Sequence, residues 1–198
     1  RHGHDVRRHG AGRRRHLRAR LTRTACTVLR RRFALLAAAG AASSLAGCGT
    51  APVQGFPTLA SAQAAIAALD ARDRTDGAWA LPQVLVHLAQ SVEYSMDGYP
   101  ELKSALFRTA VGRVAFAVFE ARGAMGHSLA EPIPGAPPLD AAVSLDTARQ
   151  RLAGALQRFE AHAGTLAPHF AYGELDKVRY TRAHLMHIAN HWTERVRS

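Results

Sequence analysis

The stretch Ala80–Asp97, ALPQVLVHLAQSVEYSMD, decides the fold of this chain. Its apolar residues recur at intervals of three and four, which is the period of one face of an α-helix. The residues that share this face are Leu81, Val84, Leu85, Leu88, Val92 and Met96. Pro82 falls in the first turn, where its missing N–H costs little. The stretch therefore predicts a helix that is buried along one side, with His87 at its centre.

Further segments with the same period complete an all-α prediction, and no strand pattern competes with them. The expected helices are Thr58–Arg72, Lys103–Arg122, Leu145–Ala163 and Asp176–Val196. The inward face expected for the second of these consists of Leu106, Ala110, Val114, Ala117 and Val118. A turn at 73–77 and a proline-rich loop at 125–143 separate the helices. We expect a four-helix bundle of up-and-down type with a long crossover connection and room for a short fifth helix.

The positive charge of the chain is confined to its beginning. Residues 1–48 contain 12 of the 26 Lys+Arg residues and one of the 15 Asp+Glu residues. Residues 49–198 therefore contain 14 basic and 14 acidic residues. A neutral body offers no basic face to neutralise phosphates, so nucleic acid is not an expected partner. Both cysteines, Cys26 and Cys48, also lie in residues 1–48. The later part of the chain must therefore be held together by apolar burial alone.

Residues 1–48 have the layout of an export leader. A basic segment precedes the apolar stretch Phe33–Ala46, and small residues follow, as in a secretory signal. Arg30, Arg31 and Phe33 fit the twin-arginine pattern R-R-x-F. Leu45–Cys48, LAGC, resembles a bacterial lipobox, which implies that Cys48 is lipidated and becomes the new N-terminus. We therefore expect an exported protein on the periplasmic side, anchored to a membrane by lipid.

Two features of the leader have a second interpretation. The apolar stretch would alternatively be a buried helix of the folded domain, although it has no amphipathic stripe. Residues 1–27 are rich in Arg, His and Gly, and they are either a long basic extension or are not translated at all. The expected organisation is a leader at 1–48, a linker at 49–57 and a helical bundle at 58–198.

Histidines are the residues most suited to chemistry. His187 and His191 are four residues apart on the expected last helix, so both rings leave the same face. His184 falls on or near that face, and His87 lies on a helix that can face it. Three imidazoles would leave a metal position open for water or a thiolate substrate. The alternative is that these are ordinary core histidines, because an H-x-x-x-H spacing also arises by chance.

The chain is similar to the DinB-like superfamily of metal-binding helical bundles, and more closely to a branch of unknown function. The segments that carry the resemblance are His87–Glu101, Ile133–Leu139, Pro168–Lys177 and Ala183–His191. In that superfamily one histidine of the second helix and an H-x-x-x-H of the last helix bind a metal. Residue by residue, this implies His87, His187 and His191 as ligands. Characterised members of the superfamily include thiol S-transferases and a hydrolase.

Two functions follow as expectations. The first is metal-dependent hydrolysis or group transfer on a small-molecule substrate, with His169 or His184 moving protons. The second is a non-enzymatic metal-binding or envelope-stress module. Imidazole ligands suit zinc, nickel, iron and copper, so the metal is not specified. Related bundles often pair, so the resemblance also allows a homodimer.

Overall fold

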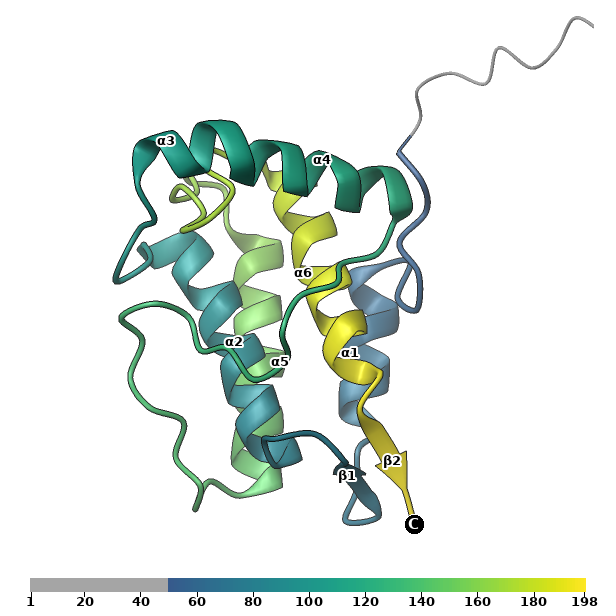
Figure 1. Cartoon of the computed structure of the whole chain (residues 1–198). Helices are drawn as coiled ribbons and strands as arrows, with labels where there is room; N and C mark the ends of the chain where they lie inside the picture. The colour runs from purple at the N-terminus through teal and green to yellow at the C-terminus, as the bar shows by residue number, and fades with distance from the viewer. Residues whose placement is uncertain (1–49) are drawn as a thin grey trace, which may run out of the picture. The chain divides into compact units, whose positions relative to one another are not determined.

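Four long helices form a bundle in the computed structural model, which describes residues 50–198 (Figure 1). They are α1 (Leu59–Ala67), α2 (Leu81–Asp97), α5 (Leu145–Ala161) and α6 (Lys177–Trp192). The most extensive packing joins α2 to α5, while α1 packs on α5 and α6. The predicted all-α bundle is confirmed. The leader residues Arg30, Arg31, Phe33 and Cys48 lie outside the described part of the chain.

Helix starts follow from local chemistry. Thr58 caps α1, because its hydroxyl accepts a hydrogen bond from the Ser61 N–H at 3.1 Å. Asp176 caps α6 by accepting from the Arg179 N–H at 2.8 Å. Pro82 lies in the first turn of α2, as predicted.

The core lies between the four long helices. Its largest fully buried apolar side chains are Ile66, Leu85, Leu88, Val92, Phe116, Leu152, Leu156, Phe159, Tyr180, Met186 and Ile188. Burying each such aliphatic or aromatic group contributes about 1.5–3 kcal/mol relative to leaving it exposed. Val53 and Phe56, from the segment expected to be a linker, are buried in the same core.

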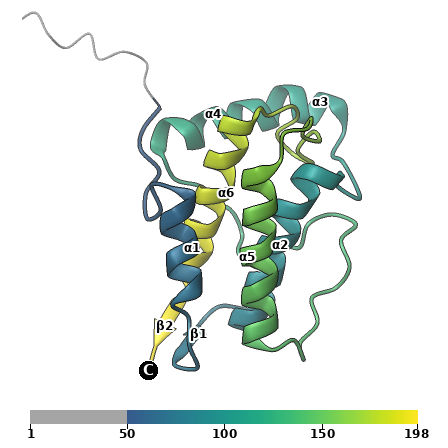
Figure 2. The same ribbon diagram turned by 180° about the vertical axis from the view of Figure 1, so that it is seen from behind.

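A further helical rod lies across one end of the bundle (Figures 1 and 2). It consists of α3 (Ala105–Phe107), the π-helical turn η1 (Arg108–Gly112) and α4 (Arg113–Arg122). The helix predicted over 103–122 is thus present, but its predicted inward face is wrong. Leu106, Ala110, Val114, Ala117 and Val118 are all exposed.

The rod instead contacts the bundle through a narrow line of residues. A Cβ on Gly112 would lie only 1.8 Å from the Ala171 carbonyl oxygen, so the close approach requires glycine. One turn on, Phe116 is buried. Beyond it, Glu120 pairs with Arg179 at 2.9 Å. The inward line therefore contains one aromatic ring and one carboxylate where aliphatic residues were expected.

A two-stranded ribbon lies at the opposite end of the bundle (Figure 1). β1 (Asp73–Thr75) and β2 (Arg195–Arg197) pair antiparallel, and Arg195 donates to the buried Asp73 carboxylate at 2.5 and 2.9 Å. The prediction of no strand, of a turn at 73–77 and of a last helix reaching Val196 is corrected here. Three-residue strands are too short to show an alternating pattern.

The connections agree with the composition of the loops. Residues 125–143 contain no regular helix, as predicted, and residues 166–172 contain none either. None of the helices in the described range 50–198 combines the length and apolarity needed to span a bilayer.

Candidate metal centre

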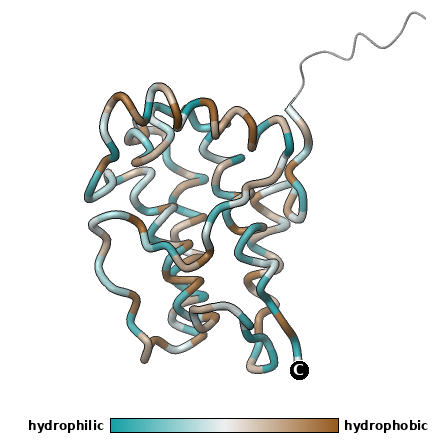
Figure 3. Tube along the Cα trace, viewed as in Figure 1, coloured by the Kyte–Doolittle hydropathy of each residue, from teal (hydrophilic) through white to brown (hydrophobic). Residues whose placement is uncertain are grey.

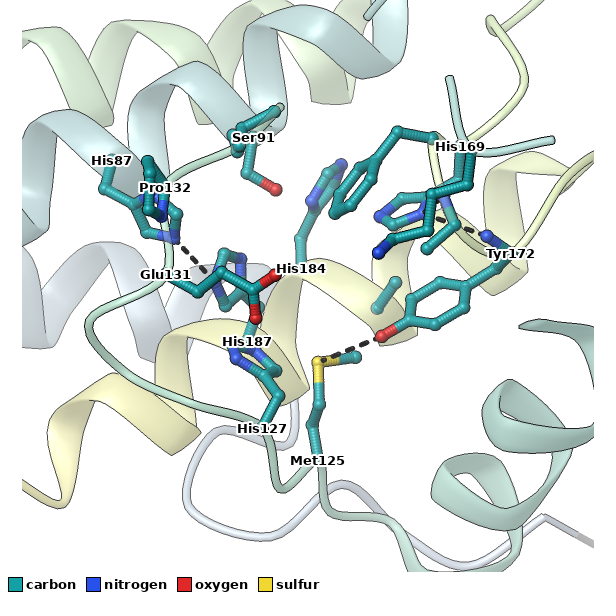
Figure 4. Close-up of a pocket in the computed structure, with 15 residues that line it drawn as sticks. His87, Ser91, Met125, His127, Glu131, Pro132, His169, Tyr172, His184 and His187 are labelled. Carbon is teal, nitrogen blue, oxygen red and sulfur yellow. Dashed lines mark hydrogen bonds between the residues drawn. The ribbon is translucent and has the colours of Figure 1, made fainter. Parts of the chain in front are cut away.

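Three histidines of α2 and α6 meet inside the bundle. One ring nitrogen from each of His87, His187 and His191 lies within 4.8 Å of the other two. The Nε2 atoms of His87 and His187 are 3.2 Å apart (Figure 4). His187 and His191 are one helical turn apart, which places both rings toward α2. The structure therefore brings together the three histidines that the sequence singled out, hereafter the His trio.

The surroundings of the trio keep its rings neutral. Burial, reinforced by the neighbouring histidines, lowers the pKa of His87 to about 4 and that of His191 to about 3. Burial likewise holds the pKa of His187 well below its usual value. Neutral imidazole is the form that binds metals. Within residues 50–198, no carboxylate is hydrogen-bonded to any ring of the trio.

Several nitrogens of the trio have no hydrogen-bond partner among residues 50–198. Both ring nitrogens of His191 and Nδ1 of His87 are buried without a hydrogen bond. Leaving a buried polar group unpaired costs about 1–3 kcal/mol. Imidazole nitrogens around a tetrahedral zinc lie about 2.0–2.1 Å from the metal, and hence about 3.3 Å from one another. The 3.2 Å separation of His87 and His187 is close to that value, so the donor set fits a divalent metal.

Aromatic packing orients the rings. Trp79, just before α2, lies nearly parallel to the His191 ring, with centroids 6.3 Å apart, and contacts the His87 ring at 5.1 Å. The Thr75 hydroxyl donates to the Trp79 carbonyl at 2.5 Å and fixes this segment. Metal-binding histidines are usually held by hydrogen bonds from their second nitrogen. Here the Trp79 indole packs against the His87 and His191 rings and restricts their orientation. No spacing in the sequence predicted this contact.

A pocket of about 160 Å³ adjoins the trio (Figure 4). Its lining combines histidines, aromatic rings and two charged side chains from five segments of the chain. The polar and aromatic members are His87, Ser91, Lys103, His127, Glu131, His169, Phe170, Tyr172, His184 and His187. Such a volume is smaller than that of a typical drug-sized site and suits a molecule of about the size of benzene.

His127 is a site residue that the sequence analysis missed. Its ring lies 5.1 Å from that of His187 and 6.0 Å from that of His191. Its Nδ1 is 2.9 Å from the Ser128 carbonyl, which can only accept, so Nδ1 carries the proton. A histidine in a loop without periodicity gave no geometric signal. Its place in a proline- and glycine-rich loop between helices was the only available hint.

The two candidate proton carriers lie beside the trio rather than in it. His184 Nε2 is 3.2 Å from the Ser95 hydroxyl, and its ring stands edge-on to Phe159. His169 is buried, not exposed in its loop, and its Nδ1 accepts from the N–H groups of Ala171 and Tyr172. The neutral His169 ring therefore carries its proton on Nε2.

The fold and the site together define an all-α bundle with a largely buried cluster of three histidines beside a pocket. Residues 53–197 match the family described as protein of unknown function (DUF1569). Because the match covers well over half of the chain, the protein belongs to this family. No curated protein and no solved structure matches the chain.

Proposed function

We propose that this domain binds a divalent metal ion through His87, His187 and His191 and promotes hydrolysis or group transfer on a small substrate. The observation that carries the proposal is the set of three neutral imidazoles beside a pocket, with His87 and His191 buried and His187 half-buried. A bound metal would supply a Lewis acid that lowers the pKa of water or of a thiol. One histidine on α2 and two on the last helix also agree with membership of the DinB-like superfamily, which we include in the proposal.

The protein's own residues would position the substrate and move protons. The Nδ1–H of His127 donates a hydrogen bond to the Ser128 carbonyl, so the lone pair on Nε2 is available to accept a proton. We therefore assign the general base to His127. His169 offers a donor at Nε2, whereas His184 already interacts with Ser95. Lys103 and Glu131 give the pocket one charge of each sign for a polar substrate.

We further propose that the domain works outside the cytoplasm, held on the periplasmic side of a membrane by lipid on Cys48. The support is the leader sequence, in which Arg30 and Arg31 precede the apolar stretch that begins at Phe33, and LAGC follows at its end. Replacing Cys48→Ala should release the protein into the soluble fraction. A variant that still sediments with membranes would contradict the anchor.

Metal content tests the central proposal. The full chain, purified without a histidine tag, is compared by elemental mass spectrometry with His187→Ala and with His162→Ala. His162 lies at the end of α5, and only the Thr165 carbonyl is within hydrogen-bond distance of its ring. We expect near-stoichiometric metal in the wild type and in His162→Ala, and its loss in His187→Ala. The N-terminal histidines are common to all three proteins, so the difference reports the trio.

Equal metal content in the wild type and His187→Ala would sink the proposal. If metal binds, assays for hydrolysis and thiol transfer separate the enzyme from the non-enzymatic metal-binding or envelope-stress module. The pocket beside the trio favours the enzyme, because a module that only captures metal needs no adjoining space for a substrate.

A further inference from the structure

The outer side of the α3–α4 rod is apolar, and no other element of residues 50–198 covers it. Leu106 and Val114 are 77% and 65% exposed, and they lie two turns apart on the same side. The exposed aliphatic residues of this side, hereafter the outer face, are Leu102, Leu106, Ala110, Val111, Val114, Ala117 and Val118. Hydrophobic positions recur along the rod in Figure 3. A row of exposed aliphatic residues of this length marks an interaction surface.

The exposed charges of the rod itself are basic, and one exposed acid, Glu101, lies beside Leu102 at its start. Within residues 102–122, all of which the structure describes, the exposed charged residues are Arg113 and Arg122. The single acid of this range, Glu120, points inward to Arg179. An apolar strip whose neighbouring charges are mostly basic is the pattern of a helix that lies on an anionic lipid surface.

The chain also enters the domain at one end of this face. Gln54 donates from its N–H to the Gly123 carbonyl at 2.8 Å and from its side chain to the Arg122 carbonyl at 3.1 Å. The Ala51 carbonyl accepts from Arg182 at 2.7 Å. Cys48 precedes Ala51 by three residues, so at most about 11 Å of extended chain separates their Cα atoms. A lipid on Cys48 would therefore hold the α4 end of the outer face next to a bilayer.

We propose that the outer face is a membrane-docking surface that lies on an anionic bilayer, with its aliphatic side chains in the interfacial region. The inference deepens the proposed lipid attachment and rests on it for delivery to the membrane. It assigns an orientation that a lipid anchor alone would leave free. The β1–β2 ribbon, at the opposite end of the bundle, then points away from the membrane (Figure 2).

A fluorescent label at one position tests this orientation. The full chain carries Cys26→Ser and Cys48→Ser, and an environment-sensitive dye is attached through Val114→Cys. The matched control carries the dye through Val196→Cys, an exposed valine on β2. With vesicles of phosphatidylcholine and phosphatidylglycerol, we expect a blue shift and quenching by brominated lipid at position 114. The dye at position 196 should not respond.

A second variant tests the contribution of the aliphatic residues. Leu106→Asp with Val118→Asp, in the chain labelled at 114, should weaken vesicle binding by about tenfold or more, since both side chains lose their apolar contact. Val196→Asp should leave binding unchanged. Leu106 and Val118 are both exposed, so we expect the double variant to fold, and circular dichroism checks this.

The opposite results are equally clear. No response at either position, or the same response at both, overturns the docking surface, because the leader is common to both chains. A blue shift at position 114 that grows with protein concentration before vesicles are added also overturns it, and indicates a second copy as the occupant. Because Cys48 is replaced and the trio is untouched, failure of lipidation or of metal binding leaves this test intact.

Discussion

The His trio and the outer face of α3–α4 depart from the usual placement of side chains in two different ways. The trio buries polar groups, and the outer face exposes apolar groups. At the trio, imidazole nitrogens are buried without partners in the protein. On the outer face, leucine and valine are exposed without partners. A buried polar group needs a hydrogen bond or a metal, whereas an exposed apolar row needs an apolar phase. The comparison teaches that each region restricts the chemical kind of partner that suits it, and these restrictions agree with the metal ion and the lipid surface that we propose.

The largest expected effect comes from disrupting the close contact of the rod with the bundle, between Gly112 and Ala171. Gly112→Ala would place a methyl group 1.8 Å from the Ala171 carbonyl oxygen. The methyl group would clash with this carbonyl and force the rod to move. We therefore expect the free energy of unfolding to fall by about 2 kcal/mol or more. Chemical denaturation measures the change.

Gly154→Ala is the matched control for this substitution. Gly154 lies within α5, and a Cβ there would meet nothing within 4 Å. Alanine should raise the free energy of unfolding by about 0.5–1 kcal/mol, because it favours the helix. If both substitutions changed stability in the same direction, the close approach at Gly112 would not be what seats the rod.

The second effect comes from removing an unpartnered ring from the trio. His191 is 1% exposed, and neither ring nitrogen has a partner. His191→Leu removes two unpaired polar atoms at similar volume, so we expect the metal-free protein to gain about 1–2 kcal/mol in stability. The same variant should lose its metal. Denaturation in the presence of a chelator measures the first effect.

His184→Leu provides the comparison within the same helix. This substitution removes the hydrogen bond between His184 and Ser95, so the metal-free protein should gain less than in His191→Leu. An equal gain in both variants would show that the missing partners of His191 do not set its energetic cost.

The sequence predicted the trio and the rod with different success, and the reason is physical. The helical period placed His187 and His191 on one face of the last helix, with His184 on or near it. The family resemblance then singled out these two with His87. The rod has apolar residues on both sides, and periodicity could not tell which side is inward. Its inner line contains Gly112 and Glu120, a close backbone approach and an ion pair, neither of which has a hydrophobic signal.

The parts that sequence analysis missed depend on contacts between distant segments. Trp79 and His127 reach the trio from connections, where no period places a side chain. The β1–β2 ribbon joins residues that are more than a hundred positions apart, and each strand has three residues. Such features follow from how the bundle closes, and local propensity does not predict them.

The smallest expected effect is the most informative about the outer face, because it tests whether the exposed aliphatic residues contribute to folding at all. Val114→Ser should change the free energy of unfolding by no more than about 0.5 kcal/mol, since an exposed valine has little packing to lose. The same substitution at Val84, which is 2% exposed on α2, should cost about 2 kcal/mol or more. A clear loss of stability at Val114 would mean that the valine is already covered in solution, by a second copy or by the chain itself. A neutral result would leave an aliphatic row that folding does not use, which is the expected behaviour of a surface kept for a membrane.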